Sequence, residues 1–226
     1  AQIFQIIEKY LSAQKTYFKI TKSSKYYIDA QRNIAFNYSK INNAEITEKK
    51  IINLINLNDK NYNLKKILAD FYRIEKNYLK AISHYTELIK ENKEDVWNIY
   101  YLRGICFERT NQWSQAENDF LKSLKIKNDS PNVLNYLAYG WIEKNMYLEK
   151  SFNMLSKAYE VNPNSFYILD SLAWAHYKRH EFKKAAELME KVIDMVPGEA
   201  ISLDHLGDIY FAMNRKREAV FYWLQA

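Results

Sequence analysis

The chain has 226 residues, 27% of them charged, and a formal net charge of +6. No stretch reaches the roughly 18 apolar residues that a bilayer-spanning helix needs, and a single cysteine, Cys106, excludes an internal disulfide bond. A genome biased towards A and T would give the same abundance of Lys, Asn and Ile, so the basic charge is weak support for nucleic-acid binding.

Small residues recur along the whole chain at intervals of 34 or 35 residues: Ala13, Thr47, Ala81, Ala116, Ser151, Ala185 and Ala219. Four positions after each stands a bulky apolar residue: Tyr17, Ile51, Tyr85, Phe120, Leu155, Met189 and Trp223. Twelve or thirteen positions before each stands a second small residue: Ala1, Ala35, Ala69, Gly104, Ala138, Ala173 and Gly207. Three positions after these comes a ring: Phe4, Tyr38, Tyr72, Phe107, Trp141, His176 and Tyr210. Closely packed helix pairs need this alternation of small and large side chains.

This register resembles the tetratricopeptide repeat (TPR). The resemblance implies an all-α fold, a right-handed superhelical solenoid of antiparallel helix pairs, with residues 1–226 forming a single array. In chain order the repeats are 1–27 (partial), 28–61, 62–95, 97–130, 131–165, 166–199 and 200–226 (partial), and Val96 is a spacer. Repeat 28–61 is the least regular, because Ala44 and Thr47 stand where better matches are expected.

Residues typical of turns and helix ends fit this division into repeats. The one extra residue of the fifth repeat is expected in its turn, near Lys144–Leu148. Pro163 and Pro197 fall where second helices should end, and Ser130 followed by Pro131 predicts a capped helix start. Since Ala1 takes the eighth position of its repeat and neither end supplies a polar cap, we expect the sequence to be part of a longer protein.

No group of residues in the sequence indicates catalysis, a metal site or a cofactor, and we expect the protein not to be an enzyme. His176 and His180 could share a helix face as metal ligands do, but His176 takes a ring position and His180 falls in a turn. The segment reads HYKRHEF, which is not the zinc-protease pattern H-E-x-x-H. Cys106 lies two positions after a small residue and is expected to be buried packing.

Resemblance to the family places the first helix of each repeat along a concave groove. The candidate partner-binding residues read from those positions are Tyr101, Tyr136, Tyr139, Tyr167, Asp170, Trp174, Tyr177, Asp204, His205, Asp208 and Phe211. Rings edged with carboxylates favour a protein or peptide segment that carries basic or aromatic residues. Some rings could instead pack between neighbouring repeats. For Tyr139 that alternative is open, and for Trp174 with Tyr177 we favour contact with a partner.

The segments LNYLAYGWIEK, ILDSLAWAHYK and LDHLGDIYF, which begin at residue 134 and continue through the last repeats, resemble a proteobacterial set of cell-envelope TPR adaptors and lipoproteins. That resemblance implies the periplasm or cell envelope, with the cytoplasm as the alternative. Chaperone-binding repeats require Asn where this chain has Phe36 after Arg32 and Asp70 after Lys66, so binding to acidic chaperone tails is not expected.

The leading hypothesis is therefore a scaffold or adaptor that binds a protein segment in its groove. The alternative is a spacer that self-associates through the ends of the solenoid. Nucleic-acid binding is a weaker alternative, because the basic runs, such as Lys183-Lys184 and Arg215-Lys216-Arg217, fall mostly on second helices and turns.

Overall fold

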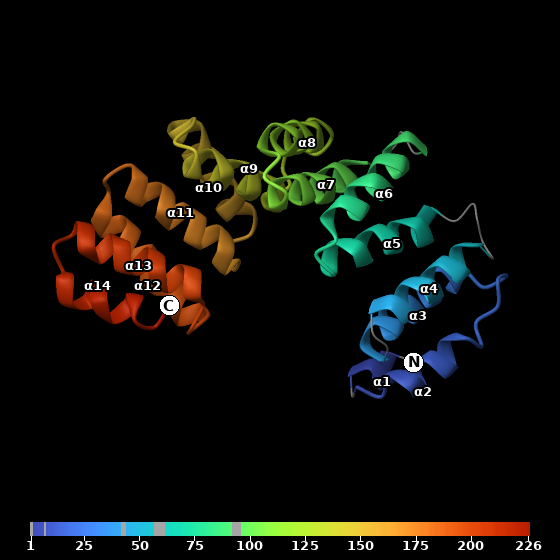
Figure 1. Cartoon of the computed structure of the whole chain (residues 1–226). Coiled ribbons are helices and arrows are strands. Elements are labelled where there is room, and N and C mark those ends of the chain that lie inside the picture. Colours follow the sequence, from blue (N-terminus) through green and yellow to red (C-terminus); the bar gives the residue numbers. More distant parts are fainter. Residues whose placement is uncertain (1, 7, 42–43, 57–61, 92–95) are drawn as a thin grey trace. The chain divides into compact units, whose positions relative to one another are not determined.

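The computed structural model describes residues 2–6, 8–41, 44–56, 62–91 and 96–226. Within these ranges the chain is all-α and contains no strand. In chain order the helices are α1 (Gln2–Ile6), α2 (Tyr10–Tyr17), α3 (Tyr27–Ile41), α4 (Ala44–Asn56), α5 (Tyr62–Ile74), α6 (Tyr78–Glu91), α7 (Trp97–Arg109), α8 (Trp113–Ile126), α9 (Pro131–Glu143), α10 (Leu148–Val161), α11 (Phe166–Lys178), α12 (Phe182–Met195), α13 (Ala200–Ala212) and α14 (Lys216–Trp223) (Figure 1). None of these described helices combines the length and the apolar character that crossing a bilayer requires.

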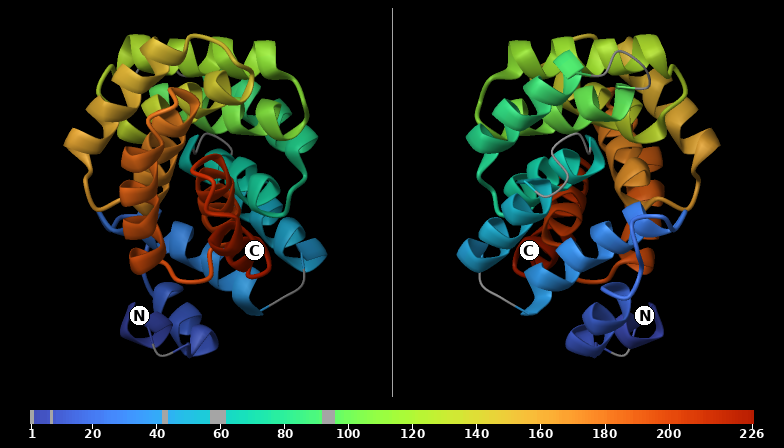
Figure 2. Two further views of the ribbon diagram at one scale, coloured as in Figure 1. Left: turned by 90° about the vertical axis from the view of Figure 1, so that its left-hand side faces the viewer. Right: turned by 90° about the vertical axis from the view of Figure 1, so that its right-hand side faces the viewer.

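The chain divides into two compact units, Ala1–Asp119 and Phe120–Ala226, and the boundary falls within α8. Each unit is built from helix pairs whose two members run antiparallel (Figures 1 and 2). In the second unit α11 contacts both α9 and α13, so the first helices of three successive pairs are neighbours. The second helices α10 and α12 each contact the first helix on either side in the chain.

The small residues of the register lie at the packed interfaces, as predicted. All seven from the second helices are 0% exposed: Ala13, Thr47, Ala81, Ala116, Ser151, Ala185 and Ala219. Gly207 shows why bulk is excluded, because a Cβ at that position would lie 2.4 Å from Cδ1 of Trp223. Ala1 lies outside the described residues, and the side chains of Phe4, Arg32 and Ala35 lie outside the described part as well.

Thr47 explains the irregular second repeat. It replaces the usual alanine, and its Oγ1 donates a hydrogen bond of 3.0 Å to the carbonyl oxygen of Tyr38 on the preceding helix. A buried hydroxyl is tolerated where it finds such a partner. The threonine therefore fits a small-residue position and adds a hydrogen bond between α3 and α4.

The first helices of five successive pairs end in one kind of turn. One turn residue adopts the left-handed conformation, and these residues are Lys76, Asn111, Asn145, His180 and Asn214. The N–H of the following residue donates to the carbonyl of the register ring, as from Asn77 to Tyr72 and from Gln112 to Phe107, both at 2.8 Å. This is the Schellman helix ending, so the ring residue also supplies the carbonyl that closes its helix.

The turn between α9 and α10 contains the extra residue predicted from the spacing. It spans residues 144–147, whereas the turns after α5, α7, α11 and α13 have one residue fewer. The additional residue, Tyr147, is also left-handed, with φ of 47°, and its ring packs edge-on against Trp141 at 5.0 Å between centroids. The turn thus absorbs the insertion while both helices keep their packing positions.

The prolines stand where the sequence predicts them, but one expected capping hydrogen bond is absent. α10 and α12 end two residues before Pro163 and Pro197, and Pro131 is the first residue of α9. Ser130 stands at the N-cap position of α9 as predicted, but its side chain makes no capping hydrogen bond. Proline at the first helical position removes one of the N–H groups that lack a partner at a helix start, and its fixed φ already suits the first helical turn.

Each unit has its own apolar core. In the first unit α5, α6 and α7 enclose Tyr85, Leu88 and Cys106. Beside that core the guanidinium of Arg103 forms a bidentate ion pair with buried Asp119. Its Nε lies 2.6 Å from Oδ2 and its Nη2 lies 2.8 Å from Oδ1. In the second unit the main core gathers residues of α9 to α14, among them Leu155, Leu172, Met189 and Leu206.

Candidate functional site

The first helices of the second unit present one continuous set of side chains, here called the first-helix face. On α9 and α11 its members recur at helical intervals of three or four, so each set forms one stripe of its helix. On α13 the residues 204, 208 and 211 follow the same intervals, and His205 stands beside Asp204. They are Asn132, Asn135, Tyr139 and Glu143 on α9; Tyr167, Asp170, Trp174 and Tyr177 on α11; and Asp204, His205, Asp208 and Phe211 on α13. Contacts between these stripes join all three helices.

A buried carboxylate ties α11 to α13. Asp170 is 7% exposed, and its Oδ2 accepts a hydrogen bond of 2.6 Å from Ser202 Oγ. Its Oδ1 lies 3.1 Å from Nδ1 of His205. A catalytic triad would require the serine to donate to the histidine. Here serine and histidine both contact the same carboxylate, so the geometry is that of a brace between repeats.

A stack of three rings lies next to this carboxylate. Trp174 stacks on Tyr177 at 4.5 Å and on His205 at 4.1 Å between centroids, with interplanar angles of 14° and 15°. The indole Nε1 donates a hydrogen bond of 2.7 Å to Glu143 on α9. Trp174 is only 6% exposed. Residues of three successive first helices are therefore held rigidly by one buried layer of rings and hydrogen bonds.

A more accessible layer lies along the same stripes. Tyr167 is 39% exposed, and its hydroxyl donates to Asn132 on α9 at 2.9 Å. Phe211 is 54% exposed and packs its ring 5.6 Å from that of Trp223. Asp204 is exposed, and Tyr177 and Asp208 are partly exposed. These side chains are the ones that a partner could contact without rearranging the buried layer.

The two aspartates of α13 lack a compensating charge. Some carboxylates of the second unit pair with bases, as Glu149 and Glu181 do with Arg179, but within the described residues neither Asp204 nor Asp208 forms an ion pair. Burial, followed by the nearby charge of Asp204, raises the pKa of Asp208. Burial also raises the pKa of Tyr177, and the Asp208 charge adds to that rise.

Charge is unevenly divided on this face. The helices α9, α11 and α13 contain four carboxylates, Glu143, Asp170, Asp204 and Asp208, and a single Lys or Arg residue, Lys178. Lys178 Nζ lies 4.8 Å from the centroid of the Trp174 ring. The face is therefore acidic in a chain whose net charge is +6.

Two of the residues selected from the sequence have no contact with this group among those described. Tyr101 is a half-buried residue of α7, in the first unit. Tyr136 is half-buried on α9, and its ring packs 6.0 Å from that of Phe120. Tyr139 stays with the face, because its ring lies 6.4 Å from that of His205. Sequence reasoning missed Ser202, which stands three residues before His205 and has no ring or charge to mark it.

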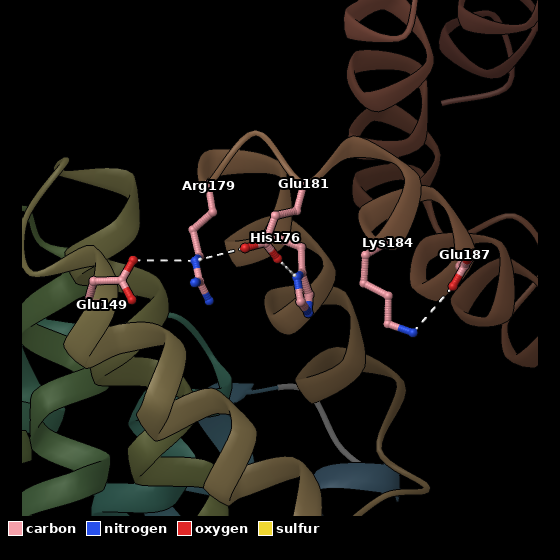
Figure 3. Close-up of polar contacts among 6 residues, drawn as sticks. All are labelled: Glu149, His176, Arg179, Glu181, Lys184 and Glu187. Atoms are coloured by element: carbon pink, nitrogen blue, oxygen red, sulfur yellow. Dashed lines mark hydrogen bonds and ion pairs between the residues drawn. The ribbon is translucent and has the colours of Figure 1, made fainter.

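The two histidines predicted not to bind a metal, His176 and His180, lie near the turn between α11 and α12, and Figure 3 shows the polar contacts around His176. His176 Nδ1 lies 2.5 Å from Oε2 of Glu181, and its ring packs edge-on against Phe152 at 5.0 Å. Arg179 contacts both Glu149 and Glu181 at 3.3 Å, which links α10 to this turn. His180 occupies the left-handed turn position. In the part of the chain described, no group of three or more His, Cys, Asp or Glu residues is arranged to hold a metal ion.

Cys106 is buried as expected, at 0% exposure. Burial raises the pKa of its thiol to about 12, so the group stays protonated at neutral pH. A protonated, inaccessible thiol is neither a nucleophile nor a metal ligand.

Comparison with known proteins identifies the class. A sequence profile described as "Tetratricopeptide repeat" matches residues 70–131 and 171–226, slightly more than half of the chain, and the chain belongs to this family. A TPR repeat-containing protein of Pseudomonas aeruginosa is 26% identical over 129 residues, covering 57% of this chain and 22% of that protein. The chain spans about a fifth of the length of the curated relatives it matches.

Solved structures agree on the fold. The structure of the APC/C hetero-tetramer Cut9–Hcn1 aligns with a TM-score of 0.76 at 14% identity, over 88% of this chain and 39% of that chain. YrrB, described as a TPR protein with an unusual peptide-binding site, aligns with a TM-score of 0.59 at 15% identity, over 77% and 89%. The TPR fold is in general a scaffold for protein–protein interaction, and its members are typically not enzymes.

Proposed function

We propose that this chain binds a segment of another protein on the first-helix face of its second unit. The observation that carries the proposal is an accessible layer of rings and uncompensated carboxylates above a rigid, buried layer. Aromatic side chains provide large contact area at low entropic cost, and they dominate the energetics of many interfaces. The partner segment would contact Tyr167, Tyr177, Asp204, Asp208 and Phe211.

The buried layer would serve this function by holding the contact residues in place. Asp170, Trp174 and His205 use their polar atoms and ring faces on one another and on neighbouring helices. Binding residues supported in this way lose little conformational freedom when a partner arrives. On this proposal Trp174 positions Tyr177 rather than contacting the partner over a large area.

The comparisons are consistent with such a role. YrrB, which shares the fold, is described as having an unusual peptide-binding site, and the type IV pilus biogenesis factor PilW aligns with a TM-score of 0.65. Both are 17% identical or less, so the likeness supports the capacity of the fold for this function and leaves the partner of this chain to experiment.

A random-peptide display library tests the proposal without knowledge of the partner. Peptides selected on the wild-type protein should bind the Phe211→Ala variant at least about tenfold more weakly, because a central aromatic contact is lost. Phe221→Ala is the matched control, since Phe221 on α14 is 59% exposed against 54% for Phe211. If the selected peptides bind both variants as they bind the wild type, the face is not the binding surface.

A further inference from the structure

We propose that the partner segment is recognised through an arginine side chain, whose guanidinium binds Asp204 and Asp208 and lies against the exposed ring of Phe211. This inference rests on the proposed function and narrows it to one kind of partner residue. It follows from the balance of hydrogen-bond donors and acceptors on the first-helix face.

The carboxylates lie on one stripe of α13. Asp204, Asp208 and Phe211 stand at intervals of four and three residues, so they follow one another along the same side of the helix at about 5–6 Å per turn. Asp208 accepts one hydrogen bond, from Trp223 Nε1 to Oδ1 at 3.2 Å. Its Oδ2 and the whole Asp204 carboxylate have no donor among the described residues, and both are available to a ligand.

A second acceptor without a donor lies in the same row of positions on α9. Asn135 is 6% exposed, and its Oδ1 has no hydrogen-bond partner within the described part of the chain. It aligns with Asp170 and Asp204 at one-repeat steps of 35 and 34 residues. On its own helix it stands between Asn132, which accepts from Tyr167 of α11, and Tyr139, which packs near His205 of α13. Asn135 therefore belongs to the same stripe of α9 as these two residues, and a buried amide oxygen without a donor is unfavourable.

Three acceptor groups on this face, the Asp204 carboxylate, Oδ2 of Asp208 and Oδ1 of Asn135, have no donor among the described residues, which favours a donor-rich ligand. Guanidinium presents five N–H donors in a plane, binds carboxylates through two parallel hydrogen bonds and stacks on aromatic rings. Lysine offers a compact charge with three donors and no planar face. The exposed ring of Phe211, one turn from Asp208, favours the planar cation.

The charge state of the site agrees with this assignment. The pKa of Asp208 is raised by burial and by Asp204, which means that the ionised carboxylate is poorly stabilised when no partner is bound. The hydrogen bond from Trp223 and the nearby charges of His205 and Lys178 lower this pKa, but no ion pair with Asp208 forms in the residues described. A cation from outside the chain would supply the missing compensation.

The test uses three blocked peptides of alternating glycine and a variable residue: arginine, lysine or the neutral isostere citrulline. Binding is followed by NMR through the indole N–H signals of the tryptophans. The Trp223 signal reports on the site directly, because this indole donates to Asp208. Trp97 and Trp113, on α7 and α8, serve as internal references.

We expect the arginine peptide to shift the Trp223 signal and to bind at least about tenfold more tightly than the citrulline peptide, with lysine between them. Asp204→Asn combined with Asp208→Asn should weaken arginine binding by at least about tenfold. The control pair, Glu187→Gln with Asp194→Asn, makes the same change in charge on the exposed side of α12 and should change binding by less than about twofold.

The inference is overturned if citrulline shifts Trp223 as strongly as arginine does, if the shift survives in the Asp204/Asp208 double variant, or if the control pair loses binding equally. These outcomes differ from a failure of the proposed function. Display-selected peptides that need Phe211 but contain no basic residue would preserve the binding face and remove its preference for arginine. Peptides that ignore Phe211 would remove both.

Discussion

Replacing Gly207 with alanine should destabilise the second unit although alanine is the better helix former. The new Cβ would stand 2.4 Å from both Cδ1 and Nε1 of Trp223. Real Cβ atoms essentially never approach a neighbouring heavy atom closer than 3.0 Å, so the indole must move. Moving it strains the packing between α13 and α14 and breaks the hydrogen bond from Trp223 to Asp208.

The magnitude can be worked from these contacts. Overpacking typically destabilises by about 1–3 kcal/mol, and a lost hydrogen bond to a charged acceptor by about 1.5–3 kcal/mol. The gain in helix propensity from glycine to alanine offsets about 1 kcal/mol. The net loss expected for Gly207→Ala is therefore about 1.5–5 kcal/mol.

Urea unfolding followed by circular dichroism measures this loss, and a double-mutant cycle assigns its cause. In a Trp223→Leu background, where the clashing indole is absent, Gly207→Ala should be neutral or slightly stabilising. The reasoning is refuted if Gly207→Ala is as stable as the wild type, or if it is equally destabilising in both backgrounds.

Three further predictions concern charge and hydrogen bonding. Asp119→Asn should lower the free energy of unfolding by about 3 kcal/mol, because Arg103 loses its bidentate carboxylate partner. A decrease of less than about 1 kcal/mol in urea unfolding would contradict this prediction. Thr47→Val should cost about 1 kcal/mol by the same measurement, through the lost bond to Tyr38, whereas an unchanged midpoint would show that the hydroxyl contributes nothing. The pKa of Asp208 is raised in the folded state, so its protonated form is the more stable there and folding loses stability as pH rises through that pKa. Asp208→Asn should therefore raise the urea midpoint at neutral pH and leave it unchanged in acid below the unfolded pKa of aspartate, and an equal effect at both pH values would contradict the assignment.

Much of the fold could be predicted because the same packing positions recur in every repeat of the sequence. Each helix pair contacts mainly its neighbours, so the small positions must remain small in every copy. Ala81, Ala116 and Ala185 were identified as core on this basis and are fully buried. The extra residue before α10 could be placed for the same reason, since only the turn tolerates it.

The candidate site was less predictable because side-chain contacts across repeats do not follow from spacing alone. The register placed Asp170, Trp174 and His205 on one face, but it could not show that they bury one another. That outcome depends on rotamers and on Ser202, a residue with no distinguishing pattern. The division within α8 also has no signal in the repeat, and a single array over residues 1–226 stays a prediction.

The left-handed turn residues are positions where glycine substitution could stabilise an engineered form of the protein. Lys76, Asn111, Asn145, His180 and Asn214 adopt a conformation that glycine takes without steric penalty. For other residues that conformation costs roughly 1–2 kcal/mol, and for asparagine less. A reserve of stability therefore lies at five well-separated points of the backbone. The stability gained from glycine at each position would add to that from the others, because distant sites are independent. These gains could offset the stability lost when the binding surface is redesigned.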